Sequence, residues 1–436
     1  MNGILVGSDA EMAERNVRVR IAHKIDGHTG FHGFVLSASV AGYAIEACDA
    51  RHLLLGLESG RSPHDWSHSG EFIEGELSCV THSCRWPVIG ARGWIVDLDD
   101  VALPLVAGRA HQSAAFRAEF EAPWTSQFMA KLRVRVENML FGYMHPSCVG
   151  ILFWGHVETA FSSARNLFAR LGLVQEGERF LEKITVVRPT ARACSADVVE
   201  RKWTHRRPLK VVFCGRDHES KNGTMALRIM QRLRREFANA DFTYIGSIPR
   251  EMLRKHAAGV AHHAMLPRES VLKVFEQSHV LFHPSQYESV GMVLLEACAA
   301  GMAVVSARGE GMDYADEIFR NGGALLVDRA RPSVDEEREY EQYLRTLLTN
   351  DGFAAQLGMR NHQTLSQGYF ACASLLRILG QSYLLAASSS SPPLALADLP
   401  HASTAVPFES QEIAQDEAAV RRRSGDGASR FHLVAP

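Results

Sequence analysis

The segment from residue 280 to residue 306 constrains the fold of this chain more than any other. It contains an apolar strand at 280–282, a polar loop, a helix that opens near Ser289 and closes at Gly301, and a second apolar strand at 303–306. Strand, helix and strand in this order form the parallel βαβ unit, whose ligand crevice lies at the carboxyl end of the strand. The segment therefore predicts a parallel α/β sheet with a ligand site after the first of these strands.

Two carboxylates mark the same segment. Glu296 lies inside the apolar run 290–300, and Glu288 precedes it with seven residues between them. A lone carboxylate in so apolar a helix is costly unless a polar group meets it. With a helix that starts near Val290, Glu296 is expected roughly 9 Å below the loop that carries Glu288. That separation suits two hydroxyl-bearing sugars at either end of a diphosphate. The alternative is a helix-terminal acid at Glu288 and a salt-bridged core residue at Glu296.

Length and composition exclude several classes of protein. The chain has 436 residues, is 46% hydrophobic, and has no apolar run that would span a bilayer, so we expect two cores of ordinary size. A net charge of −2 with scattered basic residues argues against nucleic acid as a partner. Eight single cysteines without a CxxC pair indicate reduced thiols in a cytoplasmic protein, and the first residues do not resemble a secretory signal.

The pattern of strands and helices divides the chain into two α/β halves and a tail. We expect an amino-terminal extension at 1–16, a first Rossmann-like domain at 17–190, and a second at 208–370. A closing helix is expected at 371–387. Residues 388–436, which are rich in Ser, Pro, Ala and charge, are expected to form a disordered tail.

The first half opens with a glycine-rich turn. A strand from Val17 is followed by Gly27, Gly30 and Gly33, then by a helix-like run at 34–47 and a second strand from His52. Glycines at this point allow a ligand to approach the backbone, which makes Gly30 a candidate binding residue.

A second motif lies at the start of the other half. Arg216 and Lys221 bracket the loop between a strand at 210–214 and a helix from Gly223. Two cations at the carboxyl end of a strand, beside a helix start, suit a diphosphate. The alternative is a solvated turn with surface charges.

Taken together, these motifs resemble the nucleotide-sugar-binding domain of a GT-B glycosyltransferase, specifically the retaining family 4, also called glycosyltransferase group 1. The resemblance extends over residues 210–383 and rests on the Arg216 to Lys221 entry, the two glutamates, and the Gly309 to Gly311 turn. It implies a GT-B fold, in which two Rossmann-like domains face each other across a cleft.

The resemblance also implies roles for particular residues. Glu288 would lie near the hydroxyls of the transferred sugar, and Glu296 would bind the nucleotide ribose. Arg216 and Lys221 would bind the diphosphate and offset charge on the leaving group. The expected catalytic residues are Glu288, Arg216 and Lys221, and the expected donor-binding residues are Glu296, Ser289, Val290, Gly291, Gly311 and Gly30. No metal and no cofactor beyond the nucleotide-sugar co-substrate is expected.

The implied function is transfer of a hexosyl-type sugar, with retention, to a glycan, lipid carrier, protein or small molecule. Departures from the family lie in the first half, where many members carry a strand-end histidine and this chain has Asp97, Asp99 and Asp100. Two alternatives stay open: a non-catalytic GT-B scaffold and a GT-B sugar-nucleotide epimerase.

Other polar groups have competing interpretations. Asp97 and Asp99 could hold a metal as in metal-dependent transferases, or could line the acceptor side or cap a helix. His156 could face a cleft or be a hydrogen-bonded structural residue. Histidines whose spacing matches no compact metal site are His23, His28, His32, His82 and His111. Basic residues on a predicted helix that could touch anionic lipid at the cytoplasmic face, or form one charged edge, are Lys131, Arg133 and Arg135.

Overall fold

The computed structural model describes residues 17–22, 31–37, 40, 42–56, 68–106, 120, 123–204, 208–256, 259–288, 290–309, 311–329, 333–368, 370–402 and 405–408. The chain divides into two compact units. Unit 1 comprises Met1–His28, Val35–Val187 and Leu376–Pro436, and unit 2 comprises Thr29–Phe34 and Arg188–Leu375. Two of the boundaries between the units fall within helices, one in α2 (Phe31–Ser37) and one in α16 (Cys372–Ala387). The expected extension at 1–16 lies outside the described residues.

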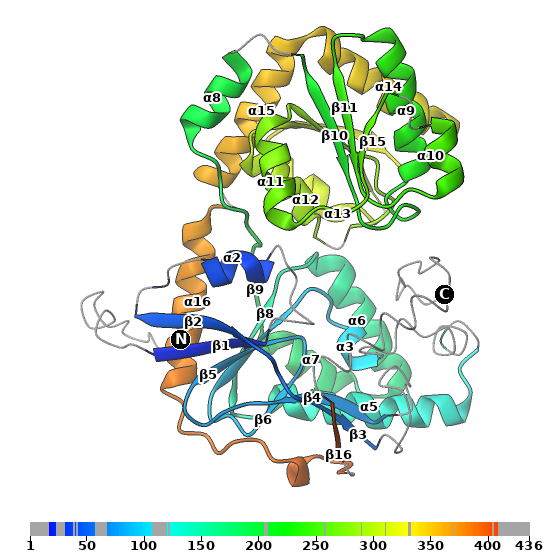
Figure 1. Cartoon of the computed structure of the whole chain (residues 1–436). Coiled ribbons are helices and arrows are strands. Elements are labelled where there is room, and N and C mark those ends of the chain that lie inside the picture. The colour runs from blue at the N-terminus through cyan, green and yellow to red at the C-terminus, as the bar shows by residue number, and fades with distance from the viewer. Residues whose placement is uncertain are drawn as a thin grey trace. The chain divides into compact units, whose positions relative to one another are not determined.

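Unit 2 is built on one six-stranded sheet in the order β12-β11-β10-β13-β14-β15 (Figure 1). All of its strand pairs are parallel. The strands are β10 (Lys210–Cys214), β11 (Asp241–Ile245), β12 (Ala261–His263), β13 (Val280–His283), β14 (Ala303–Arg308) and β15 (Ala324–Asp328). The prediction of an α/β fold with parallel strands is therefore confirmed.

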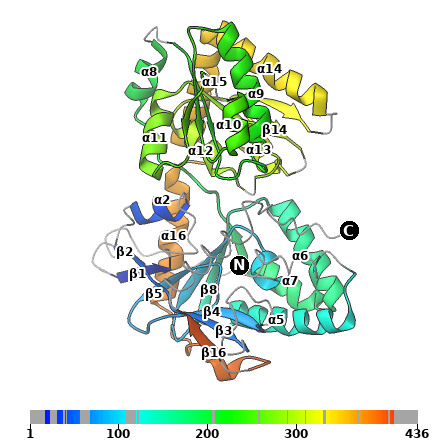
Figure 2. The ribbon, with the colours of Figure 1, turned by 45° about the vertical axis from the view of Figure 1, so that its right-hand side comes forward.

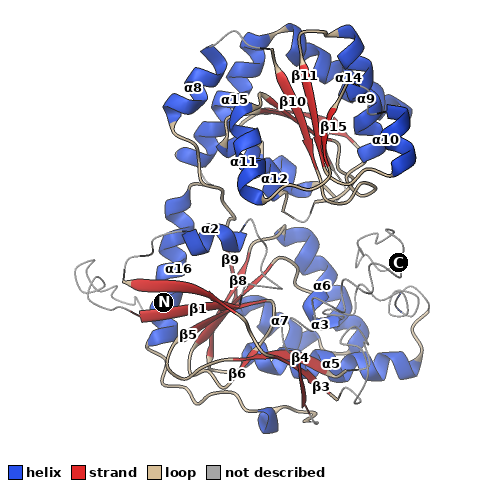
Figure 3. Cartoon of the chain, in the orientation of Figure 1, coloured by secondary structure: helices blue, strands red, loops and turns tan. Residues whose placement is uncertain are grey.

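Helices cover both faces of this sheet (Figure 3). They are α8 (Ala196–Thr204), α9 (Gly223–Glu236), α10 (Arg250–His256), α11 (Arg268–Gln277), α12 (Met292–Ala299), α13 (Asp313–Ile318), α14 (Ser333–Thr349) and α15 (Asp351–Ser366). All four residues of β13 and the first five of β14 are buried, because a strand covered on both faces has no solvated side. This is why these strands read as continuous apolar runs in the sequence.

The strand order of unit 2 reverses between β10 and β13. The chain first builds outward from β10 through β11 to β12, then returns to place β13 on the other side of β10. In open parallel sheets, ligands bind outside the carboxyl ends of the strands at this reversal. The loops that follow β10 and β13 therefore occupy the expected ligand crevice of unit 2.

Unit 1 contains a second parallel sheet, in the order β2-β1-β5-β7-β8-β9. Its strands are β1 (Val17–Ala22), β2 (Tyr43–Cys48), β5 (Val80–Cys84), β7 (Trp94–Leu98), β8 (Cys148–Phe153) and β9 (Ile184–Val186). The further helices of this unit are α3 (Leu103–Val106), α5 (Ser126–Met144), α6 (Val157–Leu171) and α7 (Val174–Lys183).

The opening of unit 1 differs from the prediction. The helix-like run at 34–47 contains only the end of α2, since Gly42 at φ +82° precedes the strand β2, which pairs in parallel with β1. The strand from His52 is β3 (His52–Leu55), and it pairs antiparallel with β4 (Gly70–Glu74) in a separate sheet. Gly33 lies within α2, while Gly27 and Gly30 lie outside the described residues.

The prediction of a disordered tail from residue 388 is wrong for residues 388–402 and 405–408. The separate sheet has the order β16-β3-β4-β6, where β6 is Val88–Ile89 and β16 is Ala405–Phe408, which belongs to the predicted tail (Figure 2). A 3-10 helix, Leu396–Asp398, lies between two leucines that are buried in the core of unit 1, Leu394 and Leu399. Leucine burial and strand pairing together fix this segment despite its Ser and Pro content.

Other predicted elements agree with the structure to within about two residues: the strand β10, the start of α9 at Gly223, and the closing helix α16. No helix in the described part of the chain combines the length and the apolar character needed to cross a membrane.

We predict that Gly358→Ala destabilises unit 2. A Cβ at Gly358 in α15 would lie 2.5 Å from the Gly301 carbonyl oxygen and 2.8 Å from Trp203. Overpacking of this kind costs about 1–3 kcal/mol. Gly352→Ala in the same helix is the control, because its Cβ meets only Asn350 at 3.7 Å and should be neutral or stabilising. Urea unfolding measures the stability of both variants. Equal midpoints would contradict the close packing of Gly358 against Gly301 and Trp203.

We also predict that Leu394→Ala destabilises unit 1 by about 2–5 kcal/mol, because it opens a cavity in the core. Leu394 is 1% exposed, whereas Leu385 on α16 is 47% exposed and supplies the matched control. Leu385→Ala should change stability much less. The measurement is thermal unfolding followed by tryptophan fluorescence. A Leu394→Ala midpoint equal to that of the wild type would show that this side chain does not stabilise unit 1.

Candidate functional site

The loops after β10 and β13 are tied to each other at the switch point of unit 2. The amide of Gln286 donates a hydrogen bond of 2.9 Å to the Ser220 carbonyl, and Ser285 Oγ donates one of 3.4 Å to the same carbonyl. Lys221 Nζ crosses between the loops and donates to the Tyr287 carbonyl at 2.8 Å. The two strands therefore present a single connected surface at their carboxyl ends.

A third loop, after β14, closes on the same surface. The amide of Glu288 donates to the Gly311 carbonyl at 2.8 Å. From the end of β15, Arg329 also donates to the Gln286 carbonyl. Gly311 has φ +78°, and a Cβ there would lie 2.9 Å from the Gln286 carbonyl oxygen. Glycine is required at this position both for its backbone angle and for the close approach of the neighbouring loop.

Glu288 is the centre of a nearly buried charged cluster. Its Oε1 accepts hydrogen bonds from Lys221 Nζ and from His283 Nε2, the latter at 2.8 Å. The Lys221 and Glu288 side chains are only 10% and 11% exposed, and His283 is fully buried at the end of β13. Lysine, glutamate and histidine from two adjacent loop regions thus converge on one carboxylate oxygen.

The electrostatics of this cluster favour the charged form of Glu288. Burial opposes the charge, but the Lys221 ammonium and the His283 hydrogen bond outweigh it and hold the pKa of the carboxyl well below its usual range. Burial in turn lowers the pKa of His283, against the pull of Glu288. The cluster is therefore a carboxylate with a lysine counter-ion and a neutral imidazole that donates to it.

Glu296 lies in α12, at some distance along the helix from Glu288. The helix begins at Met292 with Gly291 as its N-cap at φ +68°, two residues later than expected from the sequence. Glu296 is therefore about 6 Å along the axis from the first helical residue, instead of the roughly 9 Å that was predicted for its depth. Its carboxylate is 9% exposed and accepts two hydrogen bonds from Arg268 at 2.8 and 3.1 Å.

Arg216 completes the basic side of the site. It is exposed in the loop that follows β10. Burial raises the pKa of Glu296, while Arg268 and then Arg216 counteract that rise. Arg216 therefore lies close enough to Glu296 for its charge to act on that carboxylate.

The structure brings together most of the residues predicted for the donor site. Glu288 and Lys221 are in direct contact, and Gly291 and Gly311 are turn residues of the same loops. Val290 is 2% exposed, so its side chain is a core group. Ser289 and Gly30 lie outside the described residues.

Three polar residues of the site were not predicted from the sequence. His283 binds Glu288, Arg268 binds Glu296, and His218 bridges Tyr244 at 2.8 Å and Thr224 at 3.0 Å near the start of α9. His283 could have been recognised as the last residue of a buried strand. Arg268 is 28 residues from its partner, and no local pattern reveals such a pair.

The aspartates of unit 1 are bound by protein groups. Asp97 is buried, accepts from Trp154 Nε1 at 2.9 Å and lies 3.0 Å from His82 Nε2, which places it in the interior. Asp99 binds Arg85 at 2.7 and 3.0 Å. Asp100 accepts from the amides of Ala102 and Leu103 at 2.8 Å each, so the helix-capping role that was an expected alternative for Asp97 and Asp99 belongs to Asp100 instead.

Two further expectations concern surface chemistry. His156 occupies the N-cap of α6, and its Nδ1 lies 3.0 Å from Thr159 Oγ1, in keeping with a structural role. Arg135 cannot take part in a basic surface, because it is 2% exposed and donates to the carbonyls of Leu105 and Pro104. Burial lowers the pKa of Arg135 to about 10. Arg135 therefore belongs neither to a lipid-facing surface nor to a charged edge of the helix, and its inclusion in that set is wrong.

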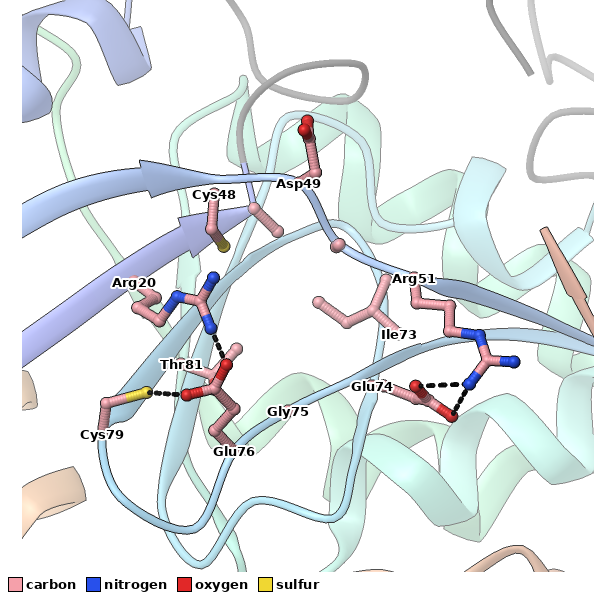
Figure 4. Close-up of a pocket in the computed structure, with 12 residues that line it drawn as sticks. Arg20, Cys48, Asp49, Arg51, Ile73, Glu74, Gly75, Glu76, Cys79 and Thr81 are labelled. Atoms are coloured by element: carbon pink, nitrogen blue, oxygen red, sulfur yellow. Dashed lines mark hydrogen bonds and ion pairs between the residues drawn. The ribbon is translucent and has the colours of Figure 1, made fainter. Parts of the chain in front are cut away.

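A separate pocket of about 200 Å³ lies in unit 1, beside β1, β2 and β4 (Figure 4). Its cations are paired with acids at its rim: Arg20 binds Glu76, and Arg51 binds Glu74 at 3.2 Å. Both arginines of this pocket are therefore engaged by carboxylates at its rim.

Comparison with known proteins agrees with the geometry of unit 2. Residues 208–350, which contain the whole candidate site, match the family described as Glycosyl transferases group 1. No curated protein matches the chain.

Solved structures extend the comparison to both units. Sucrose-phosphate synthase from Thermosynechococcus elongatus is 14% identical, with a TM-score of 0.52 over 86% of this chain and 100% of that one. WaaG, a glycosyltransferase involved in lipopolysaccharide biosynthesis, is 12% identical, with a TM-score of 0.48 over 84% and 99%. A glycosyltransferase from Rickettsia africae is 10% identical, with a TM-score of 0.49 over 86% and 100%. The chain thus has the GT-B fold, and its residues 208–350 are similar to group 1 glycosyltransferases.

We predict that Lys221→Met destabilises unit 2 by about 3–5 kcal/mol, because it leaves the buried Glu288 carboxylate without its cation. Adding Glu288→Gln to this variant should recover part of the loss, since the charge that needs a partner is then gone. Urea unfolding of the single and double variants measures the coupling.

The matched control is Arg165→Met, which removes one partner of the exposed pair with Glu178 at 2.8 Å. An exposed pair contributes little, so the midpoint should stay close to that of the wild type. Equal effects of Lys221→Met and Arg165→Met would contradict the assignment of a buried ion pair.

Proposed function

We propose that the protein is a retaining glycosyltransferase of family 4 that moves a sugar from a nucleoside diphosphate sugar to an acceptor. The observation that carries this proposal is the position of the Lys221, Glu288 and His283 cluster at the switch point of unit 2, beside Arg216 and the start of α12. Cations and helix amides at the carboxyl ends of parallel strands are suited to a diphosphate.

In the proposed reaction, the bond between the anomeric carbon and the diphosphate oxygen breaks while the acceptor oxygen bonds to the same face of the sugar. The acceptor's proton passes to the leaving phosphate oxygen, so no separate carboxylate nucleophile is needed. Arg216 and Lys221 offset the negative charge that grows on the leaving diphosphate. A metal is not part of this proposal, because these two cations and the helix amides supply the positive charge.

Glu288 and Glu296 have different tasks in this scheme. Glu288 is held as a carboxylate by Lys221 and His283, and it can accept hydrogen bonds from hydroxyls of the transferred sugar. Glu296 binds the ribose of the nucleotide from its place deeper along α12. Glycan, lipid carrier, protein and small molecule remain candidate acceptors, with the cytoplasm as the proposed location.

Nucleotide binding tests the donor site. Thermal unfolding is measured with UDP, GDP, ADP, dTDP and their common sugar conjugates, because a ligand bound only by the folded state raises the midpoint. At a concentration 100-fold above Kd, the folded state gains about 2.7 kcal/mol. We expect one base to give a clear rise that is lost in Glu296→Ala and Arg216→Ala, and retained in Arg235→Ala on the exposed side of α9.

Product analysis then separates the transferase from its alternatives. With the stabilising donor and a mixture of acceptors, a transferase forms a glycosylated product or slowly hydrolyses the donor. Interconversion of donor sugars without an acceptor would instead identify an epimerase. Nucleotide binding without any turnover would support the non-catalytic scaffold and contradict the proposed reaction.

A further inference from the structure

Arg268 is placed to control the carboxylate of Glu296. It is the first residue of α11, the helix that connects β12 to β13, and it therefore reaches Glu296 in α12 from another helix. Its Nε and Nη2 atoms lie 3.1 and 2.8 Å from Glu296, and both hydrogen bonds end on the same oxygen, Oε1. Among the residues that the structure describes, none donates a hydrogen bond to Oε2 of Glu296.

Glu296 lies in apolar surroundings, where a carboxylate needs a cation beside it. Its neighbours in α12, Leu295 and Ala297, are fully buried, and burial raises the pKa of the Glu296 carboxyl. Arg268 from α11 is the strongest opposing group, followed by Arg216 from the loop after β10. Cys214 at the end of β10 also senses this carboxylate: its pKa is raised to about 12 by burial and then by Glu296.

We propose that Arg268 is a positioning residue for the donor ribose: it binds Glu296 through Oε1, keeps the group a carboxylate, and leaves Oε2 to accept hydrogen bonds from a vicinal diol. This inference rests on the proposed donor site. A protonated Glu296 would present a hydroxyl donor in place of a charged acceptor, and hydrogen bonds to charged acceptors are the stronger kind.

The chemical consequence is selection of ribonucleotides over 2′-deoxyribonucleotides. A site built to accept a hydroxyl hydrogen bond discriminates against a ligand that lacks the hydroxyl, because the buried acceptor is then left unsatisfied. For one bond to a charged acceptor, the expected preference is roughly 10- to 100-fold in Kd. Arg268 should maintain this preference without touching the nucleotide.

The test is calorimetric binding of UDP, GDP and ADP, each beside its 2′-deoxy form, from pH 5 to pH 9. Arg268→Met removes the cation that opposes the raised pKa of Glu296, so the neutral acid extends to higher pH. We expect this variant to bind the ribonucleotide weakly at pH 5–6, to recover affinity toward pH 9, and to lose ribose preference at the acidic end.

Two variants keep the test independent of simple misfolding. Arg268→Lys retains the positive charge and should keep the wild-type pH profile, with a lower affinity because one ammonium replaces the two aligned donors. Arg250→Met, at the exposed first residue of α10, should leave both affinity and pH profile unchanged.

A double-mutant cycle of nucleotide affinity between Arg268 and Glu296 is the second readout. Glu296→Gln should bind weakly with no pH dependence from this group, and Arg268→Met added to it should cause little further loss, because Arg268 acts through the carboxylate. A uniform loss of affinity at every pH in Arg268→Met, or additive losses in the double variant, would overturn the inference while leaving the donor site intact. Binding of dTDP in preference to all three ribonucleotides would overturn the inference and leave the donor site standing. If the wild type binds neither dTDP nor any of the three ribonucleotides, the proposed function falls as well.

Discussion

The candidate site of unit 2 depends on one interaction: the buried Glu288 carboxylate held by Lys221 and His283. A carboxylate at this depth is stable only when a cation and a hydrogen-bond donor meet it, and both come from the ends of β13 and the loop after β10. The same lysine also binds the Tyr287 carbonyl, so it joins the two loops that flank the switch point. The lysine that neutralises Glu288 therefore also fixes the geometry of the two loops.

Glu296, the second carboxylate of the site, is also nearly buried and also paired with a cation. Glu296 lies in an almost wholly apolar helix and is paired with Arg268 from α11. The two glutamates are thus bound by separate cations, each of which contacts a single carboxylate oxygen. This arrangement leaves each carboxylate with acceptor capacity, which a hydroxyl-rich ligand such as a nucleotide sugar can use.

Unit 2 was predictable because its strands β13 and β14 are buried almost throughout and the helix α12 lies between them in sequence. Prediction from local sequence patterns failed where the interacting residues lie far apart along the chain. Strand β16 pairs with β3 across about 350 residues, and Leu394 and Leu399 fill the core from a segment whose Ser and Pro content indicates disorder. Likewise, Glu296 was recognised from its apolar surroundings, but its partner Arg268 belongs to another helix, and only the folded sheet brings them together.

The central claim is that a nucleoside diphosphate binds at the carboxyl ends of β10 and β13. A crystal structure of the protein with the nucleoside diphosphate that most raises its unfolding midpoint tests this claim most directly. The account predicts a diphosphate beside Arg216, Lys221 and the first turn of α12, with its ribose on Glu296. A nucleotide bound elsewhere, with Glu288 and Glu296 still held only by their present partners, would contradict it.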